Sequence, residues 1–237
     1  MTDLAAQIVV LAEEPIPGRV RTGLTPPFSS REAAALAAAG LADTLEAVRR
    51  TRVVRRVLCL AGEPGPWLPD GFEVLAQRGR GRDERIAAAM WDTYAGLPLP
   101  MILVGAGTPQ ITAGLLEAAA EPLARTMADA AFGPSENGGF WLLGLRRPDP
   151  DLTLGVPMGE PITGRAQLVR LIQAGLRIHM TPELAGVDTL PEAAQVARLA
   201  PASRFATTLA ATLGAPAELD EPAFGDWVLG VPEASFS

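Results

Sequence analysis

The segment PIPGRVRTGL, residues 15–24, is the first candidate for phosphate chemistry, because it contains Gly18 and two arginines. Gly18 lets the backbone approach a ligand closely, and the guanidinium groups of Arg19 and Arg21 present planar donors that match phosphate oxygens. The segment fits neither the Walker loop nor the GxGxxG motif. From its spacing alone, a solvated basic loop is the simpler interpretation, so phosphate binding needs support from elsewhere in the chain.

A second glycine-bearing segment is VGAGTPQIT, residues 104–112, which follows an apolar run of strand length. Gly105 and Gly107 would again bring the backbone close to a ligand. A metal-dependent transferase would need a carboxylate here to hold a divalent cation against the phosphates. The segment contains no Asp or Glu, so it offers backbone groups rather than an anionic metal ligand.

The turn SENGG, residues 135–139, is the third candidate. Its paired glycines, Gly138 and Gly139, follow two polar residues, Glu136 and Asn137. The pattern indicates either a backbone that passes near a ligand or a simple hairpin turn. The sequence does not decide between these two readings.

Three single residues could also take part in chemistry. Asp188, in AGVDTLPEAAQ at residues 185–195, is either a ligand or, with Thr189, the N-terminal cap of the following helix, and capping alone is the simpler reading. Cys59 is the only cysteine and lies in an apolar run, which is typical of a buried strand thiol. His179 is the only histidine, and no GxSxG elbow accompanies it, so we expect a structural role.

The elements that must position these residues follow from hydrophobic periodicity. Apolar runs of strand length alternate with Ala-rich amphipathic stretches, which predicts βαβ units around a mostly parallel sheet. We expect strands over residues 8–12, 53–62, 72–77, 101–106, 128–134, 140–145 and 176–180, and helices over 31–50, 83–96, 113–124, 164–175 and 190–200. The short turn before residue 140 predicts an antiparallel neighbour and a mixed sheet. Ligands of such sheets bind at the carboxyl ends of the strands.

Composition limits the classes of protein. A chain of 237 residues with 48% hydrophobic residues can form one α/β domain, and its single cysteine cannot form an internal disulfide. A net charge of −7 disfavours nucleic acid and anionic membranes as partners. The N-terminus has neither a basic region nor a long apolar run, so we expect no signal peptide, no membrane span and a cytoplasmic location.

In order along the chain, six blocks resemble the bacterial DUF2064 family, CofC-like proteins of the GT-A glycosyltransferase fold. The blocks are AEEPIPGRVRTGLTP, LADTL, GRGRDERIAAAM, ILVGAGTPQIT, GPSENGGFWLLGL and VDTLPEA, and the resemblance covers about residues 8–199. The resemblance implies a three-layer α/β/α fold with a mostly parallel mixed sheet, of the GT-A (nucleotide-diphospho-sugar transferase) type. It also implies a nucleotide-binding domain over residues 1–200, with residues 201–237 as a helical extension and tail of the same domain.

The same resemblance implies a transfer reaction at a nucleoside triphosphate or nucleotide sugar, assisted by Mg²⁺ or Mn²⁺. Glu13, Glu136 and Asp188 are the carboxylates that could rebuild a displaced cation site, with Glu136 and Asp188 as the metal candidates, and the catalytic candidates are Asn137 and Asp188. The candidates for nucleotide and phosphate binding are Pro17, Gly18, Arg19, Arg21, Thr22, Gly105, Gly107, Gly138 and Gly139.

The chain departs from the family pattern where charge would matter. Family members usually have Lys where this chain has Glu13, and Lys-Thr-Arg where it has residues 21–23. The usual metal aspartates fall on Gly107 and Asn137, and Phe140 replaces a tyrosine. Hard cations prefer anionic oxygen ligands, so we expect metal-dependent transfer to be weakened or redirected.

Three functions remain open at this point. The first is a nucleotide or nucleotide-sugar binder with altered transfer chemistry. The second is a non-catalytic homologue that acts as a scaffold, a homodimer or a partner subunit. The third, which the local sequence supports least, is a hydrolase that uses Cys59 or His179.

Two substitutions would separate these readings. If Arg21 binds phosphate, Arg21→Ala should weaken nucleotide binding with little change in melting temperature. If the ancestral metal geometry survives, Gly107→Asp together with Asn137→Asp should create a response to Mn²⁺ or Mg²⁺.

Overall fold

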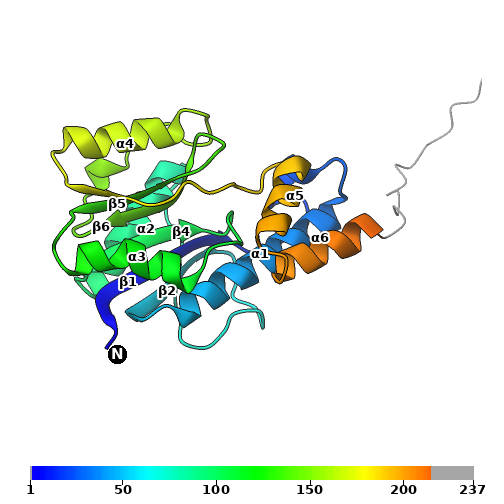
Figure 1. Ribbon diagram of the computed structural model, residues 1–237, viewed down its shortest axis with the longest axis horizontal. Helices are drawn as coiled ribbons and strands as arrows, with labels where there is room; N and C mark the ends of the chain where they lie inside the picture. The colour runs from blue at the N-terminus through cyan, green and yellow to red at the C-terminus, as the bar shows by residue number, and fades with distance from the viewer. Residues whose placement is uncertain (1, 215–237) are drawn as a thin grey trace, which may run out of the picture.

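A seven-stranded sheet forms the middle layer of the protein, which the computed structural model describes over residues 2–214 (Figure 1). The strands lie in the order β3-β2-β1-β4-β6-β5-β7. Only β6 runs antiparallel to its neighbours, β4 and β5, while the other pairs are parallel. The strands are β1 (Leu4–Glu13), β2 (Val53–Ala61), β3 (Glu73–Ala76), β4 (Met101–Gly105), β5 (Ala130–Pro134), β6 (Phe140–Leu145) and β7 (Ile178–Met180). The predicted mostly parallel, mixed sheet is confirmed.

Helices cover both faces of this sheet, so the expected three-layer α/β/α arrangement is also confirmed. Residues of α1 and α3 pack on one face, and residues of α2 and α4 pack on the other. The helices are α1 (Ser30–Arg50), α2 (Arg82–Gly96), α3 (Ala113–Ala124), α4 (Thr163–Gln173), α5 (Leu190–Leu199) and α6 (Arg204–Gly214). Two short 3₁₀ turns, η1 (Thr22–Leu24) and η2 (Pro150–Leu152), were not predicted, because three residues leave no periodic pattern.

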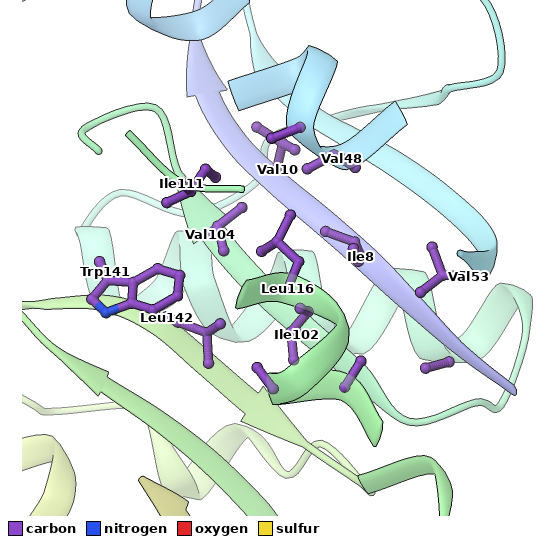
Figure 2. Packing of buried hydrophobic residues seen from close by; sticks show 14 of the residues in the cluster. Ile8, Val10, Val48, Val53, Ile102, Val104, Ile111, Leu116, Trp141 and Leu142 are labelled. Atoms are coloured by element: carbon purple, nitrogen blue, oxygen red, sulfur yellow. The ribbon is translucent and has the colours of Figure 1, made fainter. Parts of the chain in front are cut away.

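The interior strand β1 is buried on both faces, which explains its continuous apolar run. Ile8 and Val10 pack in the cluster that includes Val48 of α1 and Leu116 of α3 (Figure 2). Val9 belongs to the cluster on the opposite face, because successive strand side chains point to opposite sides. Full burial of each such side chain stabilises the fold by roughly 1.5–3 kcal/mol.

A third apolar cluster lies beyond the ends of the strands and joins α5 and α6 to the loop that follows β1. It contains Leu24 and Phe28 of that loop, Val187 before α5, and Phe205 and Leu209 of α6. Figure 1 shows α5 and α6 beside α1, past the tips of the strands. We propose on this basis that α6 belongs to the same domain as residues 1–200. The expected tail, residues 215–237, lies outside the described residues.

Within residues 2–214, no helix combines the length and apolar character needed to cross a bilayer.

Ser29 caps the start of α1. The Glu32 backbone N–H donates to Ser29 Oγ at 3.3 Å, and the Ser29 backbone N–H donates to Glu32 Oε2 at 2.7 Å. This reciprocal capping box satisfies two backbone donors that the first helical turn cannot pair internally.

Ser29→Ala should therefore lower the free energy of unfolding by about 1 kcal/mol. The measurement is urea denaturation followed by circular dichroism. Ser30→Ala, one residue further into the helix, is the matched control and should change the stability by less than about 0.5 kcal/mol. Equal losses in the two variants would show that the capping box does not stabilise α1.

Asp129 anchors the amino-terminal end of β5 through two arginines. Its carboxylate accepts from Arg177 Nε at 2.8 Å and from the Arg177 backbone N–H at 3.2 Å, and Arg146 Nη2 donates to its other oxygen. The Arg177 hydrogen bond, with a smaller contribution from Arg146, holds the pKa of the Asp129 carboxyl well below its usual range. Because the folded pKa is depressed, this stabilisation is present above the unfolded pKa of about 3.9 and is lost as pH falls below it.

Asp129→Asn should thus destabilise the protein at pH 7 and make its stability fall less steeply than that of the wild type below about pH 4. Urea denaturation at a series of pH values from 7 downward measures both effects. Asp70→Asn, at an exposed loop position, serves as the control. Parallel stability profiles of Asp129→Asn and the wild type would contradict the assignment.

Candidate functional site

All four segments with candidate residues meet at one edge of the sheet. The loops after β1 and β4 leave the carboxyl ends of parallel strands, and the segment after β7 leaves the same edge. The turn between β5 and β6 lies there too, because β6 starts where β5 ends and runs back antiparallel. The edge predicted for ligand binding is therefore the edge where the candidate residues gather.

Arg21 links three of these segments through its guanidinium group. Its Nη1 donates to the Val187 backbone oxygen at 2.8 Å, and its Nη2 donates to the Ala106 backbone oxygen at 2.7 Å. The Asp188 carboxylate lies 3.3 Å from Nη1. The Arg21 backbone is left-handed, with φ 51° and ψ 38°, an uncommon conformation for a non-glycine residue. The side chain is thus a cross-link within the protein as well as a phosphate-binding candidate.

The charge of Arg21 persists despite its surroundings. Burial lowers the pKa of the guanidinium, the Asp188 carboxylate raises it, and the nearby Arg82 lowers it again. An arginine in a protein nevertheless stays protonated at neutral pH. The side chain is 19% exposed, so this resident cation borders solvent at the strand edge.

Asp188 points toward the other candidate residues and does not cap α5. Its Oδ2 accepts from Asn137 Nδ2 at 2.6 Å, and its Oδ1 faces Arg21. The capping box of α5 is formed by Thr189 and Glu192 instead. The simpler sequence reading, that Asp188 serves only as a cap, is wrong, because Glu192 takes the backbone donors and leaves the Asp188 carboxylate free to bridge the segments.

The segment before α5 lies directly against the loop after β1. A Cβ atom at Gly23 would sit only 2.8 Å from the Asp188 backbone oxygen, so a side chain there would require the segments to shift. Gln110 holds the same segment from the β4 side, where its Nε2 donates to the Ala185 backbone oxygen at 2.7 Å. We call these contacts, together with those of Arg21, the loop clasp.

The paired glycines of the turn serve the protein's own packing. Residues 135–139 form a tight hairpin, in which the Gly138 backbone N–H donates to the Ser135 oxygen at 2.9 Å. Gly138 has φ 82°, and a Cβ atom there would overlap the backbone of Pro161. A Cβ atom at Gly164 would similarly overlap the Gly139 carbonyl oxygen. The close approach that these glycines allow is to the start of α4, and their role in ligand binding stays a prediction.

Other candidate residues face open space. Gly18 has φ 78° and, like Pro17, Arg19 and Thr22, is exposed. A Cβ atom at Gly18 would have no neighbour within 4 Å, and one at Gly105 would meet only a backbone nitrogen at 4.0 Å. The end of β4 is therefore unfilled by the protein itself.

Glu13, which stands where the family usually has Lys, is paired with an arginine of α2. Arg85 Nη1 donates to Glu13 Oε1 at 2.9 Å. A positive charge thus lies near the end of β1, although it comes from a different element. The sequence reading missed Arg85, since nothing in the pattern of α2 indicates which of its charged residues reaches β1.

The residues present do not fit a divalent cation. Within residues 2–214, no group of three or more His, Cys, Asp and Glu side chains could hold a metal ion. Glu136 accepts from Gln195 Nε2 at 3.0 Å, and Asp188 is engaged by Arg21 and Asn137. The two metal candidates therefore do not combine into a coordination site, because each is already bonded to the protein.

Cys59 and His179 are the two residues that the hydrolase reading would need. Cys59 is buried in β2, and burial raises the pKa of its thiol to about 11, so the reactive thiolate is suppressed at neutral pH. His179 lies in β7, the outermost strand of the sheet, and pairs in register with Ala131. Neither residue is in an activating environment, which argues against the hydrolase reading.

The fold is that of the nucleotide-diphospho-sugar transferases. A candidate nucleotide-diphospho-sugar transferase from Desulfovibrio desulfuricans G20 superposes with a TM-score of 0.77 at 25% identity, over 90% of this chain and 94% of that one. Two more distant structures share the fold alone. A CMP:2-keto-3-deoxy-manno-octonic acid synthetase complexed with CTP has a TM-score of 0.52 at 14% identity, over 83% of this chain and 98% of that one. A cytidylyltransferase from Leptospira borgpetersenii serovar Hardjo-bovis (strain JB197) has a TM-score of 0.51 at 12% identity, over 88% and 93%.

The family described as "Uncharacterized protein conserved in bacteria (DUF2064)" matches residues 44–160, which confirms the resemblance found in the sequence. The matched stretch includes Gly107 and Asn137 but neither Arg21 nor Asp188. No curated protein matches the sequence.

The loop clasp changes the outcome expected for Arg21→Ala. Removal of the guanidinium leaves the Ala106 and Val187 carbonyl oxygens without their donor, so the free energy of unfolding should fall by about 2 kcal/mol. Arg19→Ala, an exposed position in the same loop, should change it by less than about 0.5 kcal/mol. Thermal and urea denaturation measure the difference, and an unaltered stability of Arg21→Ala would mean that the clasp is not formed in solution.

Proposed function

We propose that this chain binds a nucleoside triphosphate or a nucleotide sugar at the carboxyl edge of β1 and β4, as a transferase-like protein. The observation that carries the proposal is the unfilled space at Gly105, where a Cβ atom would meet nothing closer than 4.0 Å. In sheets of this class, the crevice outside the strand ends is where ligands bind.

The residues around that space suit a phosphate-bearing ligand. Leu11 of β1 pairs with Gly105, and two residues further along β1 the Glu13–Arg85 pair borders the same face of the sheet. Arg19 and Gly18 lie in the loop that continues from β1, and both are exposed. Backbone without side chains and nearby guanidinium groups are features that favour phosphate binding.

The relatives support a nucleotide as the ligand class. The synthetase of similar fold was crystallised with CTP, and the other distant neighbour is a cytidylyltransferase. The Desulfovibrio protein, at 25% identity, is a candidate nucleotide-diphospho-sugar transferase. A nucleic acid is a poor alternative, because the net charge of −7 opposes it.

We further propose that transfer chemistry is weak or redirected. Asp188 and Asn137, the catalytic candidates, hydrogen bond to one another at 2.6 Å. Both oxygens of the Asp188 carboxylate are thus engaged by the protein, one by Asn137 and the other by Arg21, so neither is free to accept a proton from a substrate. The chain would then retain nucleotide binding although its transfer activity is weak.

A non-catalytic partner protein is the second candidate. It is favoured by a hollow between α1 and α6, lined mostly by alanines that include Ala35, Ala38 and Ala39. None of the lining residues is a candidate for nucleotide binding, so a protein partner could use this surface without any nucleotide. A stable complex with another protein that nucleotides do not disturb would favour this function.

The test is calorimetric titration with GTP, CTP, UDP-glucose and GDP-mannose, for which we expect at least one dissociation constant near the micromolar range, about −8 kcal/mol. Gly105→Val should weaken that binding about tenfold or more with little change in melting temperature, because its side chain enters open space. Gly114→Val, in α3 and near only Thr112, is the control. Absence of binding across the panel would reject the proposal, and undiminished binding by Gly105→Val would place the ligand elsewhere.

A further inference from the structure

Three oxygen atoms converge on a single positive group at the candidate site. The Ala106 and Val187 backbone oxygens lie 2.7 and 2.8 Å from the Arg21 guanidinium nitrogens, and an Asp188 carboxylate oxygen lies 3.3 Å away. Carbonyl and carboxylate oxygens are also the ligands of hard divalent cations. Here the guanidinium already occupies the centre of that oxygen set.

Gly107 lies next to the Arg21 guanidinium group. A Cβ atom at this position would be 3.4 Å from Arg21 Nη2 and 3.8 Å from Nη1. A carboxylate introduced there would therefore meet a guanidinium, which is a strong hydrogen-bond donor to carboxylates. It would form an ion pair with Arg21 before it could offer oxygens to a metal ion.

The remaining oxygens near this centre are also engaged. Asn137 Oδ1 accepts from the Gly139 backbone N–H at 3.0 Å, and its Nδ2 donates to Asp188 at 2.6 Å. Asp188 thereby has one oxygen on Asn137 and the other on Arg21. A divalent cation would have to displace a resident positive charge as well as these hydrogen bonds, and the like charges would repel it.

We propose that the Arg21 guanidinium is the permanent cation of this site and that its phosphate-bearing ligand binds without a divalent metal ion. The part concerning the ligand rests on the proposed function, whereas the part concerning the cation rests on Arg21 alone. Three protein acceptors use three of the five N–H groups that a guanidinium carries, and the side chain remains 19% exposed. A phosphate at the strand edge can therefore face a charge that the chain itself supplies.

The first test is a titration of the nucleotide-free protein with Mn²⁺, in which electron paramagnetic resonance measures how much of the metal is bound. We expect no Mn²⁺ bound by the wild type below about millimolar concentration, because the oxygen set is filled. Binding of Mn²⁺ by the wild type that Asp188→Asn abolishes would overturn the proposal.

Engineered variants make the second test. Gly107→Asp with Asn137→Asp should gain no Mn²⁺ affinity while Arg21 is present, whereas the further change Arg21→Gln should raise that affinity about tenfold or more. Glutamine is chosen because its amide can still donate to one carbonyl while it removes the charge. Arg19→Gln in place of Arg21→Gln is the matched control. Equal Mn²⁺ affinity with and without Arg21 would contradict the proposal, and circular dichroism verifies that each variant is folded.

Nucleotide titrations in EDTA and in Mg²⁺ form the third test. The nucleotide dissociation constant should be the same within about twofold, and Arg21→Gln should raise it about tenfold in both buffers. Binding that requires Mg²⁺ would overturn the inference. If no nucleotide binds, the proposed function fails, while the two Mn²⁺ experiments still decide whether Arg21 excludes the metal.

Discussion

A partly buried guanidinium must find hydrogen-bond acceptors, and this requirement organises the ligand edge of the protein. Arg21 leaves the loop after β1 and reaches backbone oxygens after β4 and before α5, which are 85 and 166 residues away in sequence. An unpaired charge in such a position would be costly, so the three segments are held where their oxygens meet it. The loops at this edge are thus positioned by one charge and its acceptors, while the sheet beneath is positioned by apolar packing.

Small residues make this arrangement sterically possible. Gly23 lets the Asp188 backbone approach the first loop, and a Cβ atom at Gly186 would lie 3.3 Å from the Asn137 amide nitrogen. Gly138 and Gly164 do the same where the β5–β6 turn meets α4. The glycines of this edge therefore mostly allow protein segments to approach each other. Gly18 and Gly105 differ, because space remains beside them.

The site also shows how a charge pattern can be rearranged while the fold is kept. Glu13 reverses the sign usual in the family, but Arg85 of α2 pairs with it at 2.9 Å. At Gly107 and Asn137 the carboxylates implied by the family resemblance are absent, and a Cβ atom at Gly107 would have the Arg21 guanidinium as its nearest neighbour. If the family carboxylates hold a metal cation, a chain that places the Arg21 guanidinium at this position no longer needs them to balance the charge. A binding site for anions can in this way become independent of an added cation.

Most of the fold followed from the sequence, because local patterns carry it. The alternation of apolar runs and Ala-rich stretches predicted every strand and the helices up to residue 200. The order of the strands followed only in part, since it depends on pairings between distant segments. The candidate loops were also found from the sequence, because glycines and arginines after apolar runs are a local signal.

What the sequence by itself determined is the set of elements and the edge at which the candidate residues gather, since periodicity and turn residues act over short distances. What only the tertiary structure decided is the use of each polar group. Asp188 bridges Asn137 and Arg21 instead of capping α5, and Arg21 binds carbonyl oxygens that have no sequence signature. Backbone acceptors look alike at every residue, so the partner of a buried charge is settled only when packing brings distant segments within about 3 Å of each other.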